Sequence, residues 1–343
     1  MKDSKTYKIP FLALTILLII CLLANISLGS VHIPLKDVFN SLIGNTLQEN
    51  TWQHIILNYR LPKAFTAILV GSGLGISGLL MQTLFRNPLA GPFVLGISSG
   101  ASLGVALVIL GSGLFGGFLT TLLLSKWSIV IAASSGSFLV LLAVLITSLK
   151  VRDTMAILII GLMFSSITAA IVSVLSYFGS AEQLQQYTFW GFGSLGNLSW
   201  NELLIFFIIY AFGILVSITS VKSLNTLLLG QNYAKSLGLN IKRSRLAIII
   251  ATSLLAGTIT AFAGPIAFIG LAIPHLTRQV FNTSNHKILL PATFLFGAII
   301  MLVCDSISQV PNSDYTLPIN AITSLIGAPV VIWLLVRKRK MMF

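Results

Sequence analysis

Three glycines in the first third of the sequence, Gly73, Gly75 and Gly78, have the G-x-G-x-x-G spacing that can bind a nucleotide pyrophosphate. That chemistry needs a β-strand before the glycines and an acidic residue about twenty positions after them. Here the glycines lie inside a long apolar run, and no acidic residue follows at that distance. We therefore interpret them as packing residues of a membrane helix, because small residues four positions apart let two helices approach closely. This spacing occurs at Gly71/Gly75, Gly100/Gly104 and Gly113/Gly117.

Other patterns that carry catalysis or metal binding are missing. No Walker A sequence occurs, so we expect this chain not to hydrolyse ATP itself. It has no H-E-x-x-H helix and no pair of carboxylates inside an apolar run for acid–base work, so we predict no catalytic residues. Cys21 and Cys304 lie in apolar runs, and His32 and His54 have no carboxylate companion. We therefore predict no disulfide and no metal site.

Asp305 is the one acidic residue at the end of an apolar run in the C-terminal half of the sequence. An ionisable group at membrane depth is a functional candidate by default. The alternative is a structural carboxylate at the outer end of a helix, bonded to Ser306 or Ser308. The sequence leaves both interpretations open.

The composition indicates that these residues belong to a membrane protein. Hydrophobic residues make up 56% of the 343 positions and charged residues only 8%, which is too little polar surface for a soluble globule. The net charge of +13 does not indicate nucleic-acid binding, because the basic residues lie in short gaps between apolar runs. We predict an all-α, polytopic protein of the lipid bilayer, with residues 1–343 forming a single transmembrane permease domain and no nucleic-acid partner.

A bilayer core requires about 20 apolar residues per helix, and about ten such segments are present. The N-terminal one is long enough to be an uncleaved span rather than a signal peptide. The segment from Gly264 to Phe281 is shorter. Two proline-containing pairs, Gly264-Pro265 and Ile273-Pro274, interrupt it as in a broken helix. The other predicted spans are 9–29, 64–85, 93–112, 127–149, 154–178, 203–220, 246–262, 288–304 and 317–336.

The distribution of basic residues predicts the orientation. With about ten spans and an inside N-terminus, most of the 21 Lys and Arg residues fall in cytoplasmic segments, as the positive-inside rule requires. These include Lys2, Lys5 and Lys8, Arg152 and the tail 337–340. The outside keeps Lys36, Arg60, Lys63 and Lys126. We predict both termini in the cytoplasm, short helices within 30–59 and 221–245, and an interfacial turn at 179–202.

Four sequence blocks resemble the permease subunits of the FecCD family of ABC importers. They are Arg60-Leu61-Pro62-Lys63, the stretch 71–102 with RNPLAGPFVLGISSGAS, the stretch 224–245, and GPIAFIGLAIPHLTRQVF at 264–281 continued at 317–335. The resemblance implies about ten helices per subunit, a dimer with a second copy or a paralogue, two separate ATP-binding cassette ATPase subunits and an extracytoplasmic substrate-binding protein. It also implies that ATP is used only by the partner subunits and that this chain needs no cofactor.

The resemblance assigns a role to the inner segment between the sixth and seventh spans, which couples the permease to the ATPase. Its small and polar residues suit a helix that docks on another protein. Gln231 stands where relatives usually carry Glu, so a charge contact there should be weaker in this chain. The predicted coupling segment comprises Leu229, Gly230, Gln231, Asn232, Tyr233, Ala234, Lys235, Ser236, Leu237 and Gly238.

On the outer side, Arg60 and Lys63 match basic residues with which relatives meet acidic residues of the binding protein. Such charges steer docking more than they add affinity. The alternative is that both side chains snorkel at a helix end. Gln309 replaces a family arginine, and Thr316 replaces the glutamate of the usual Glu-Leu-Pro, so docking on that side should differ.

The remaining matched residues are predicted to be architectural or to lie near the inner gate. In the turn that follows the second span, a proline ends one helix and an asparagine caps backbone donors. The turn consists of Arg86, Asn87 and Pro88. A second group of residues interrupts or bends the short eighth span: Gly264, Pro265, Pro274 and His275.

The sequence is compatible with three kinds of function. The first is a permease without chemistry of its own in the bacterial cytoplasmic membrane, importing an iron-siderophore or a related metal-chelate, with haem or vitamin B12 as alternative cargo. The second is an ion-coupled secondary transporter, which would need charged residues within its spans. The third is an intramembrane enzyme, which the missing motifs disfavour.

Overall fold

The computed structural model describes residues 7–29, 31, 33–44, 50–114, 125–151, 154–310 and 315–336. Within these ranges the chain is helical, and its one extended pairing is an isolated antiparallel bridge between Gln309 and Thr316. The all-α prediction is confirmed. Several residues of the sequence predictions lie outside the described part: Lys2, Lys5, His32, Gly117, Arg152 and 337–340.

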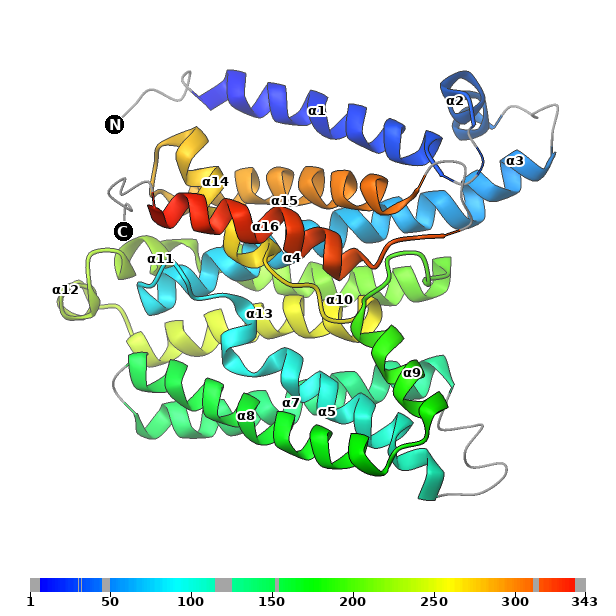
Figure 1. The fold of residues 1–343 in the computed structure, drawn as a ribbon. Helices are drawn as coiled ribbons and strands as arrows, with labels where there is room; N and C mark the ends of the chain where they lie inside the picture. Colours follow the sequence, from blue (N-terminus) through cyan, green and yellow to red (C-terminus); the bar gives the residue numbers. More distant parts are fainter. Residues whose placement is uncertain are drawn as a thin grey trace. The chain divides into compact units, whose positions relative to one another are not determined.

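Figure 1 shows the helices in chain order. They are α1 (Lys8–Ser27), α2 (Leu35–Ile43), α3 (Asn50–Ile55), α4 (Leu61–Phe85), α5 (Ile97–Ile109), α7 (Lys126–Lys150), α8 (Thr154–Phe178), α9 (Ala181–Gly191), α10 (Trp200–Thr219), α11 (Val221–Leu227), α12 (Gln231–Ser236), α13 (Ile241–Ala263), α14 (Ile269–Phe281), α15 (His286–Ser308) and α16 (Ile319–Val336).

Nine of the ten predicted spans coincide with an apolar helix among the described residues, and the short segment 264–281 does not. Among the described residues, 7 helices are long and apolar enough to cross a membrane, and α5 and α16 are shorter apolar helices. The predicted short span is α14, which has 13 residues. The helix that contains the predicted second span begins before residue 64, because a π-helical turn at Ile56–Arg60 joins α3 to α4 and makes Thr51–Phe85 one helical run.

Two local expectations need correction. The segment 179–202 is not only a turn, because α9 occupies Ala181–Gly191. Its N-terminus carries a capping box, in which Ser180 accepts from the Gln183 amide and Gln183 accepts from the Ser180 amide. The third predicted span is shortened, because Gly96 adopts a left-handed conformation and separates a 3-10 turn at Pro92–Leu95 from α5.

The contacts divide the chain into two compact units that alternate along the sequence. Unit 1 comprises 1–76, 194–208 and 266–342, and unit 2 comprises 77–193 and 209–265. Helices α4 and α10 therefore contribute to both units. The single domain of residues 1–343 stays a prediction.

In unit 1, α1 packs along α15 and α14 packs against both α15 and α16. Leu14, Phe281 and Ile299 form a buried cluster, with the Phe11 and Phe281 rings 4.8 Å apart. The initial part of α4 approaches α15 at glycines, since a methyl group built on Gly71 would collide with the carbonyl oxygen of Gly297. This confirms that the small-residue spacing in α4 serves close helix packing.

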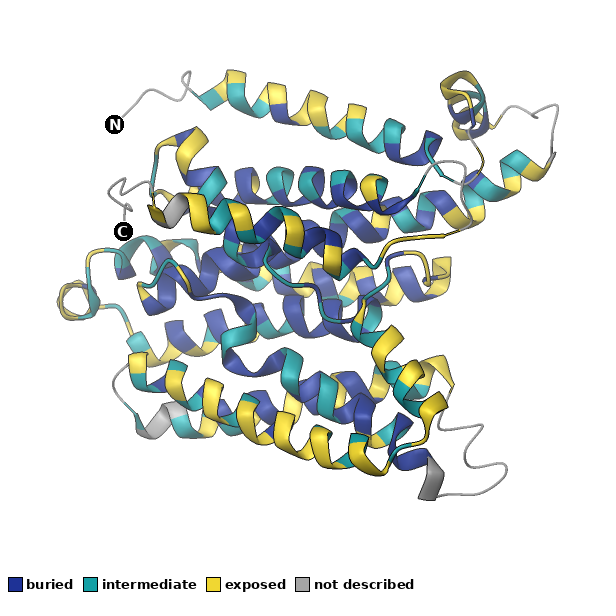
Figure 2. Cartoon of the chain, in the orientation of Figure 1, coloured by how far each residue is buried: buried dark blue, intermediate teal, exposed yellow. Residues whose placement is uncertain are grey.

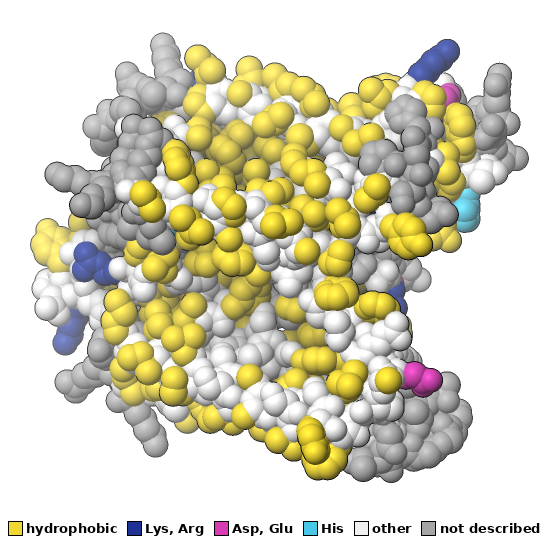
Figure 3. Space-filling model, in the orientation of Figure 1, with side chains coloured by type: hydrophobic (Ala, Val, Ile, Leu, Met, Phe, Trp, Pro, Cys, Tyr) yellow, Lys and Arg dark blue, Asp and Glu magenta, His cyan; other side chains and the backbone are white. Residues whose placement is uncertain are grey.

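In unit 2, α5 lies against α7, α8, α9 and α13. Its buried residues combine glycine and alanine, such as Ala101 and Ala106, with larger side chains such as Ile109. Gly100 and Gly104 face Gly136 and the Ala132 carbonyl of α7, so the two backbones touch. Figure 2 shows α5 largely buried, whereas much of α8 is exposed. Hydrophobic side chains also predominate on the face drawn in Figure 3, as expected for a surface that meets lipid.

Candidate functional site

The predicted coupling segment forms the short helix α12 between α11 and α13, and it packs on both of them. Ala234 is fully buried and provides the inner face of the helix. On the outside, Leu229, Tyr233 and Leu237 are 59%, 57% and 59% exposed. The segment therefore presents large apolar side chains to solvent, and Tyr233 and Leu237 are spaced to share one helix face.

Glycines delimit this segment. Gly230 precedes α12 with φ +101°, and Gly238 follows it with φ +83°, a conformation that a residue with a Cβ rarely adopts. A methyl group on Gly238 would meet nothing within 4 Å, so backbone conformation rather than space requires glycine there. The two turns fix how α12 projects from unit 2.

The Arg86-Asn87-Pro88 turn lies beside the start of α12 in the same unit. Arg86 ends α4 in a left-handed conformation with φ +47°, which is uncommon for a residue other than glycine or asparagine. Its guanidinium Nη1 lies 3.5 Å from the position of a methyl group on Gly230. Asn87 Oδ1 accepts from the Leu89 amide at 2.9 Å, which confirms that Asn87 caps backbone donors in this turn.

Arg60 lies in unit 1 and is buried, with 9% of its surface exposed. Its guanidinium donates to the carbonyl oxygens of Ile26 at 2.7 Å and Ser27 at 2.8 Å, and also to that of Val31. Arg60 lies just before α4, and its hydrogen bonds hold the segment that follows α1 against this position. It does not snorkel, and its predicted docking role stays a prediction.

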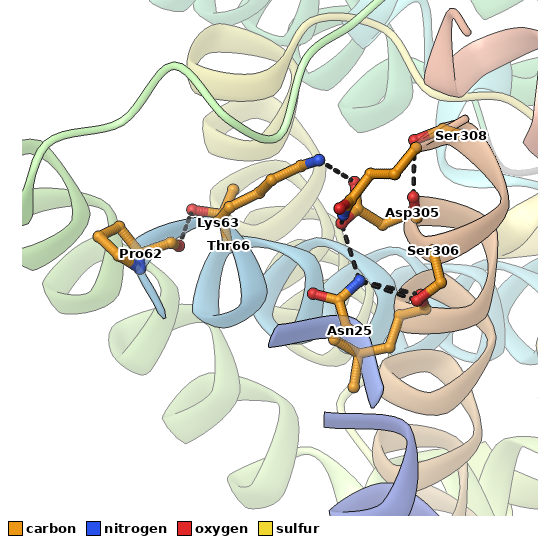
Figure 4. Close-up of polar contacts among 9 residues, drawn as sticks. Asn25, Pro62, Lys63, Thr66, Asp305, Ser306 and Ser308 are labelled. Carbon is orange, nitrogen blue, oxygen red and sulfur yellow. Dashed lines mark hydrogen bonds and ion pairs between the residues drawn. The ribbon is translucent and has the colours of Figure 1, made fainter. Parts of the chain in front are cut away.

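Lys63, one turn further along α4, reaches the carboxylate of Asp305 in the last turn of α15 (Figure 4). The Lys63 Nζ to Asp305 Oδ1 distance is 3.1 Å, and the side chains are 21% and 2% exposed. Asp305 Oδ2 also accepts from Asn25 Nδ2 at 2.9 Å and from Gln309 Nε2 at 2.8 Å. These four residues, which we call the Asp305 cluster, join the ends of α1, α4 and α15.

The two serines next to Asp305 do not bond its carboxylate in the way expected from the sequence. Ser308 Oγ donates to the Asp305 backbone carbonyl at 2.7 Å, and Ser306 Oγ accepts from Asn25 Nδ2 at 3.0 Å. The carboxylate is instead satisfied by residues from other parts of the chain. Sequence reasoning found Asp305 and Lys63 separately but missed Asn25, whose only signal was a polar residue near the end of an apolar run.

The chain between α13 and α14 is the break that the sequence predicted. Gly264 has φ +77° and lies so close to unit 2 residues that a methyl group there would be 2.8 Å from the Trp190 carbonyl oxygen. Pro265 follows, and Phe268 begins α14 with φ +65°. Pro274 and His275 lie inside α14, which continues from Ile269 to Phe281, so the expected break at Ile273-Pro274 is wrong. Gly264 and Pro265 suit a rigid bend, and the role of all four residues at a gate stays a prediction.

Neither a serine nucleophile nor a metal centre is found in the described part of the chain. Gly96 to Gly100 has G-x-S-x-G spacing, which sequence reasoning overlooked, but Ser98 lies in the first turn of α5 after a 3-10 turn. A nucleophile elbow requires a strand before the serine. Among the described residues, no group of three or more His, Cys, Asp or Glu side chains could hold a metal ion.

Comparison with known proteins gives the family. The family model for the FecCD transport family matches residues 17–337. The hemin transport system permease protein HmuU of Yersinia pestis is 34% identical over 328 residues, which cover 95% of each chain. The vitamin B12 import system permease protein BtuC of Klebsiella pneumoniae is 35% identical over 327 residues, covering 95% of this chain and 93% of BtuC.

Solved structures agree with the fold. A metal-chelate type ABC transporter in an inward-facing conformation matches with a TM-score of 0.83 and 31% identity, covering 97% of this chain and 100% of the other. PsaBC from Streptococcus pneumoniae has a TM-score of 0.52 and 19% identity, which supports the fold alone. Because the family model and the curated relatives extend over nearly the whole sequence, this chain belongs to the FecCD transport family of membrane permeases.

Proposed function

We propose that this chain is the membrane-spanning subunit of an ATP-driven importer for an iron-siderophore or a related metal-chelate. In this proposal it pairs with a second copy or a paralogue, receives cargo from an extracytoplasmic binding protein and contacts two ATPase subunits. The observation that carries it is the exposed apolar surface of the coupling segment, formed by Tyr233 of α12 and by Leu229 and Leu237 on either side of it, in a chain of permease type. Exposed apolar side chains on a short projecting helix suit docking into a groove of a partner protein.

The proposal also includes an orientation in the membrane, and it assigns no chemical reaction to this chain. We infer that α12 and both termini face the cytoplasm of a bacterium, because most Lys and Arg residues then lie inside. ATP is bound and hydrolysed only by the partner subunits, so the chain itself is not an enzyme and needs no cofactor. ATP binding and hydrolysis on the partner subunits shift the permease between its outward-facing and inward-facing states through α12.

Ion-coupled transport is the less favoured alternative. Such a transporter needs ionisable side chains within its spans to carry or release the coupling ion. In the described membrane-length helices, the Asp, Glu, Lys and Arg residues lie near helix ends, as Glu202 and Asp305 do, except for Arg60 and Lys63 in the long run Thr51–Phe85. This distribution supports a pathway without a charge relay.

The cargo is the finer part of the proposal. Iron-siderophore is our first choice, and haem and vitamin B12 are the cargoes in the names of two relatives. Radiolabelled uptake by cells that lack the gene tests it, with several ferric chelates, haem and cobalamin measured in parallel. We expect uptake of one siderophore class to be lost and to be restored by the gene. If only haem or cobalamin uptake is lost, the importer proposal stands and the cargo choice is wrong.

Arg86 gives a prediction about coupling. Replacing it with glycine relieves the left-handed backbone, which costs a residue with a Cβ about 1–2 kcal/mol, while removing the guanidinium beside Gly230. We expect Arg86→Gly to keep the thermal stability of the protein and to reduce transport per ATP hydrolysed by about fivefold or more. The measurement is transport and ATPase activity of the assembled importer in lipid vesicles.

The matched control is Asn282→Gly. Asn282 ends α14 with φ +45° and belongs to unit 1, so the substitution changes a left-handed residue to glycine outside the unit that contains α12. It should leave transport per ATP unchanged. Equal ratios in the two variants would show that Arg86 has no role in coupling.

A further inference from the structure

The sequence suggested that Lys63 pairs with an acidic residue of a binding protein, but in the Asp305 cluster it pairs with a carboxylate of its own chain. The Lys63 ammonium is turned toward a buried carboxylate, and its stem passes Gly196, where a methyl group would lie 3.6 Å from Cδ. Lys63 is nevertheless the most accessible member of the pair, with 21% of its side chain exposed against 2% for Asp305. A flexible four-carbon stem lets a lysine change partners without moving the backbone.

Arg60 has no such freedom. Its guanidinium is bonded to the carbonyl oxygens of Ile26, Ser27 and Val31, and only 9% of the residue is exposed. Releasing it would break the hydrogen bonds from this charged donor to the carbonyl oxygens of the buried residues Ile26 and Ser27, which is costly. Of the two basic residues at this end of α4, Lys63 is therefore the exchangeable one and Arg60 is structural.

The charge balance of the cluster explains why Lys63 is held. Asn25 and Gln309 give Asp305 hydrogen bonds but no charge, so among the described residues Lys63 is the one cation in an ion pair with this carboxylate. A buried carboxylate strongly favours a counter-charge. Gln309 is four residues after Asp305 in the same helix end, which is the spacing at which a basic side chain could supply that charge instead.

We propose that Asp305 competes with the partner protein for Lys63. This competition sets how strongly this end of the permease binds an acidic protein surface. In the free permease Asp305 holds the ammonium, and in the docked state a partner carboxylate takes it while Asn25 and Gln309 keep Asp305 hydrogen-bonded. This inference rests on the proposed function, in which the extracytoplasmic binding protein docks here. The partner surface it requires carries at least one exposed carboxylate opposite Lys63.

The first test measures whether Lys63 is released, without a partner protein. The full-length permease in lipid nanodiscs is treated with an amine-acylating ester, and the acylation rate of Lys63 is followed by mass spectrometry. Asp305→Asn keeps the shape and one acceptor oxygen but removes the charge. We expect Lys63 to react about fivefold faster in Asp305→Asn and also in Gln309→Arg, where the new guanidinium neutralises Asp305. Unchanged rates in both variants would overturn the proposal.

The second test measures docking. The probe is the purified extracytoplasmic protein that binds the chelate whose uptake depends on this gene, and its affinity for the assembled importer in nanodiscs is measured at low and high salt. Asp305→Asn should bind about fivefold more tightly at low salt, with a smaller gain at high salt. In the Lys63→Met background, Asp305→Asn should give no gain.

Asp37→Asn is the charge control. Asp37 lies in α2 of the same unit, has no ion pair among the described residues, and loses the same unit of negative charge. Equal tightening by Asp37→Asn, or equal tightening with and without Lys63, would mean that only net charge matters and would overturn the proposal. If the wild-type importer binds the probe and takes up chelate while Asp305→Asn has no effect, this inference alone fails. If the wild type neither binds nor transports, the proposed function fails with it.

Discussion

Replacing Tyr233 and Leu237 together with aspartate is expected to abolish ATP-dependent transport. Tyr233 lies in α12 and Leu237 directly follows its last residue; both side chains are more than half exposed, so they are available to a partner. Burying a large apolar side chain contributes about 1.5–3 kcal/mol, and a carboxylate in an apolar groove adds a further penalty. We expect the affinity for the ATPase subunits to fall by about a hundredfold or more.

The measurement is co-purification of the ATPase with the permease, followed by transport in vesicles. The control is Asn232→Asp with Ser236→Asp, which places the same two charges on exposed polar positions of the same helix. This control variant should co-purify with most of the ATPase that the wild-type permease binds. Normal co-purification and transport by the Tyr233 and Leu237 variant would show that α12 is not the docking segment.

Gly104→Ala is expected to destabilise the protein strongly, although it adds one methyl group. That methyl group would collide with the Ala132 carbonyl oxygen and lie 2.8 Å from its carbon, so α5 and α7 would have to separate. Overpacking of this kind typically costs about 1–3 kcal/mol, and a backbone neighbour cannot rotate away. Lower thermal stability in detergent, followed by size-exclusion chromatography, is the expected result.

Gly257→Ala is the matched comparison within α13 of the same unit. A methyl group there would lie 3.8 Å from Ile97 Cγ2 and 3.9 Å from Ser137 Cβ, which are ordinary contacts. Because alanine favours a helix over glycine by about 1 kcal/mol, this variant should be neutral or more stable. If the two variants had the same stability, the close contact of α5 with α7 would be wrong.

The sequence predicted the helices well because apolar length and small-residue spacing are local properties. Gly71, Gly100 and Gly104 were interpreted as packing residues from spacing alone, and each lies against a neighbouring backbone. Helix α9 was missed although its capping box at Ser180 and Gln183 is readable in the sequence. The polar character of the segment suggested an interfacial turn instead.

The pairings in the candidate site could not be predicted in the same way. The Lys63 ion pair with Asp305 and the Asn25 hydrogen bond join residues far apart in the chain. Only the packing of α1 and α4 against α15 decides which polar side chains meet. The burial of Arg60 was hidden for a related reason, since its acceptors are backbone carbonyls that no sequence motif marks.

The most direct test of the account is transport by the purified parts. The permease and its ATPase are reconstituted in lipid vesicles with ATP enclosed and with the chelate-loaded binding protein outside. We predict chelate uptake that requires ATP hydrolysis and is unaffected by a protonophore or a sodium ionophore. Uptake without ATP, driven by a proton or sodium gradient, would contradict the proposed function.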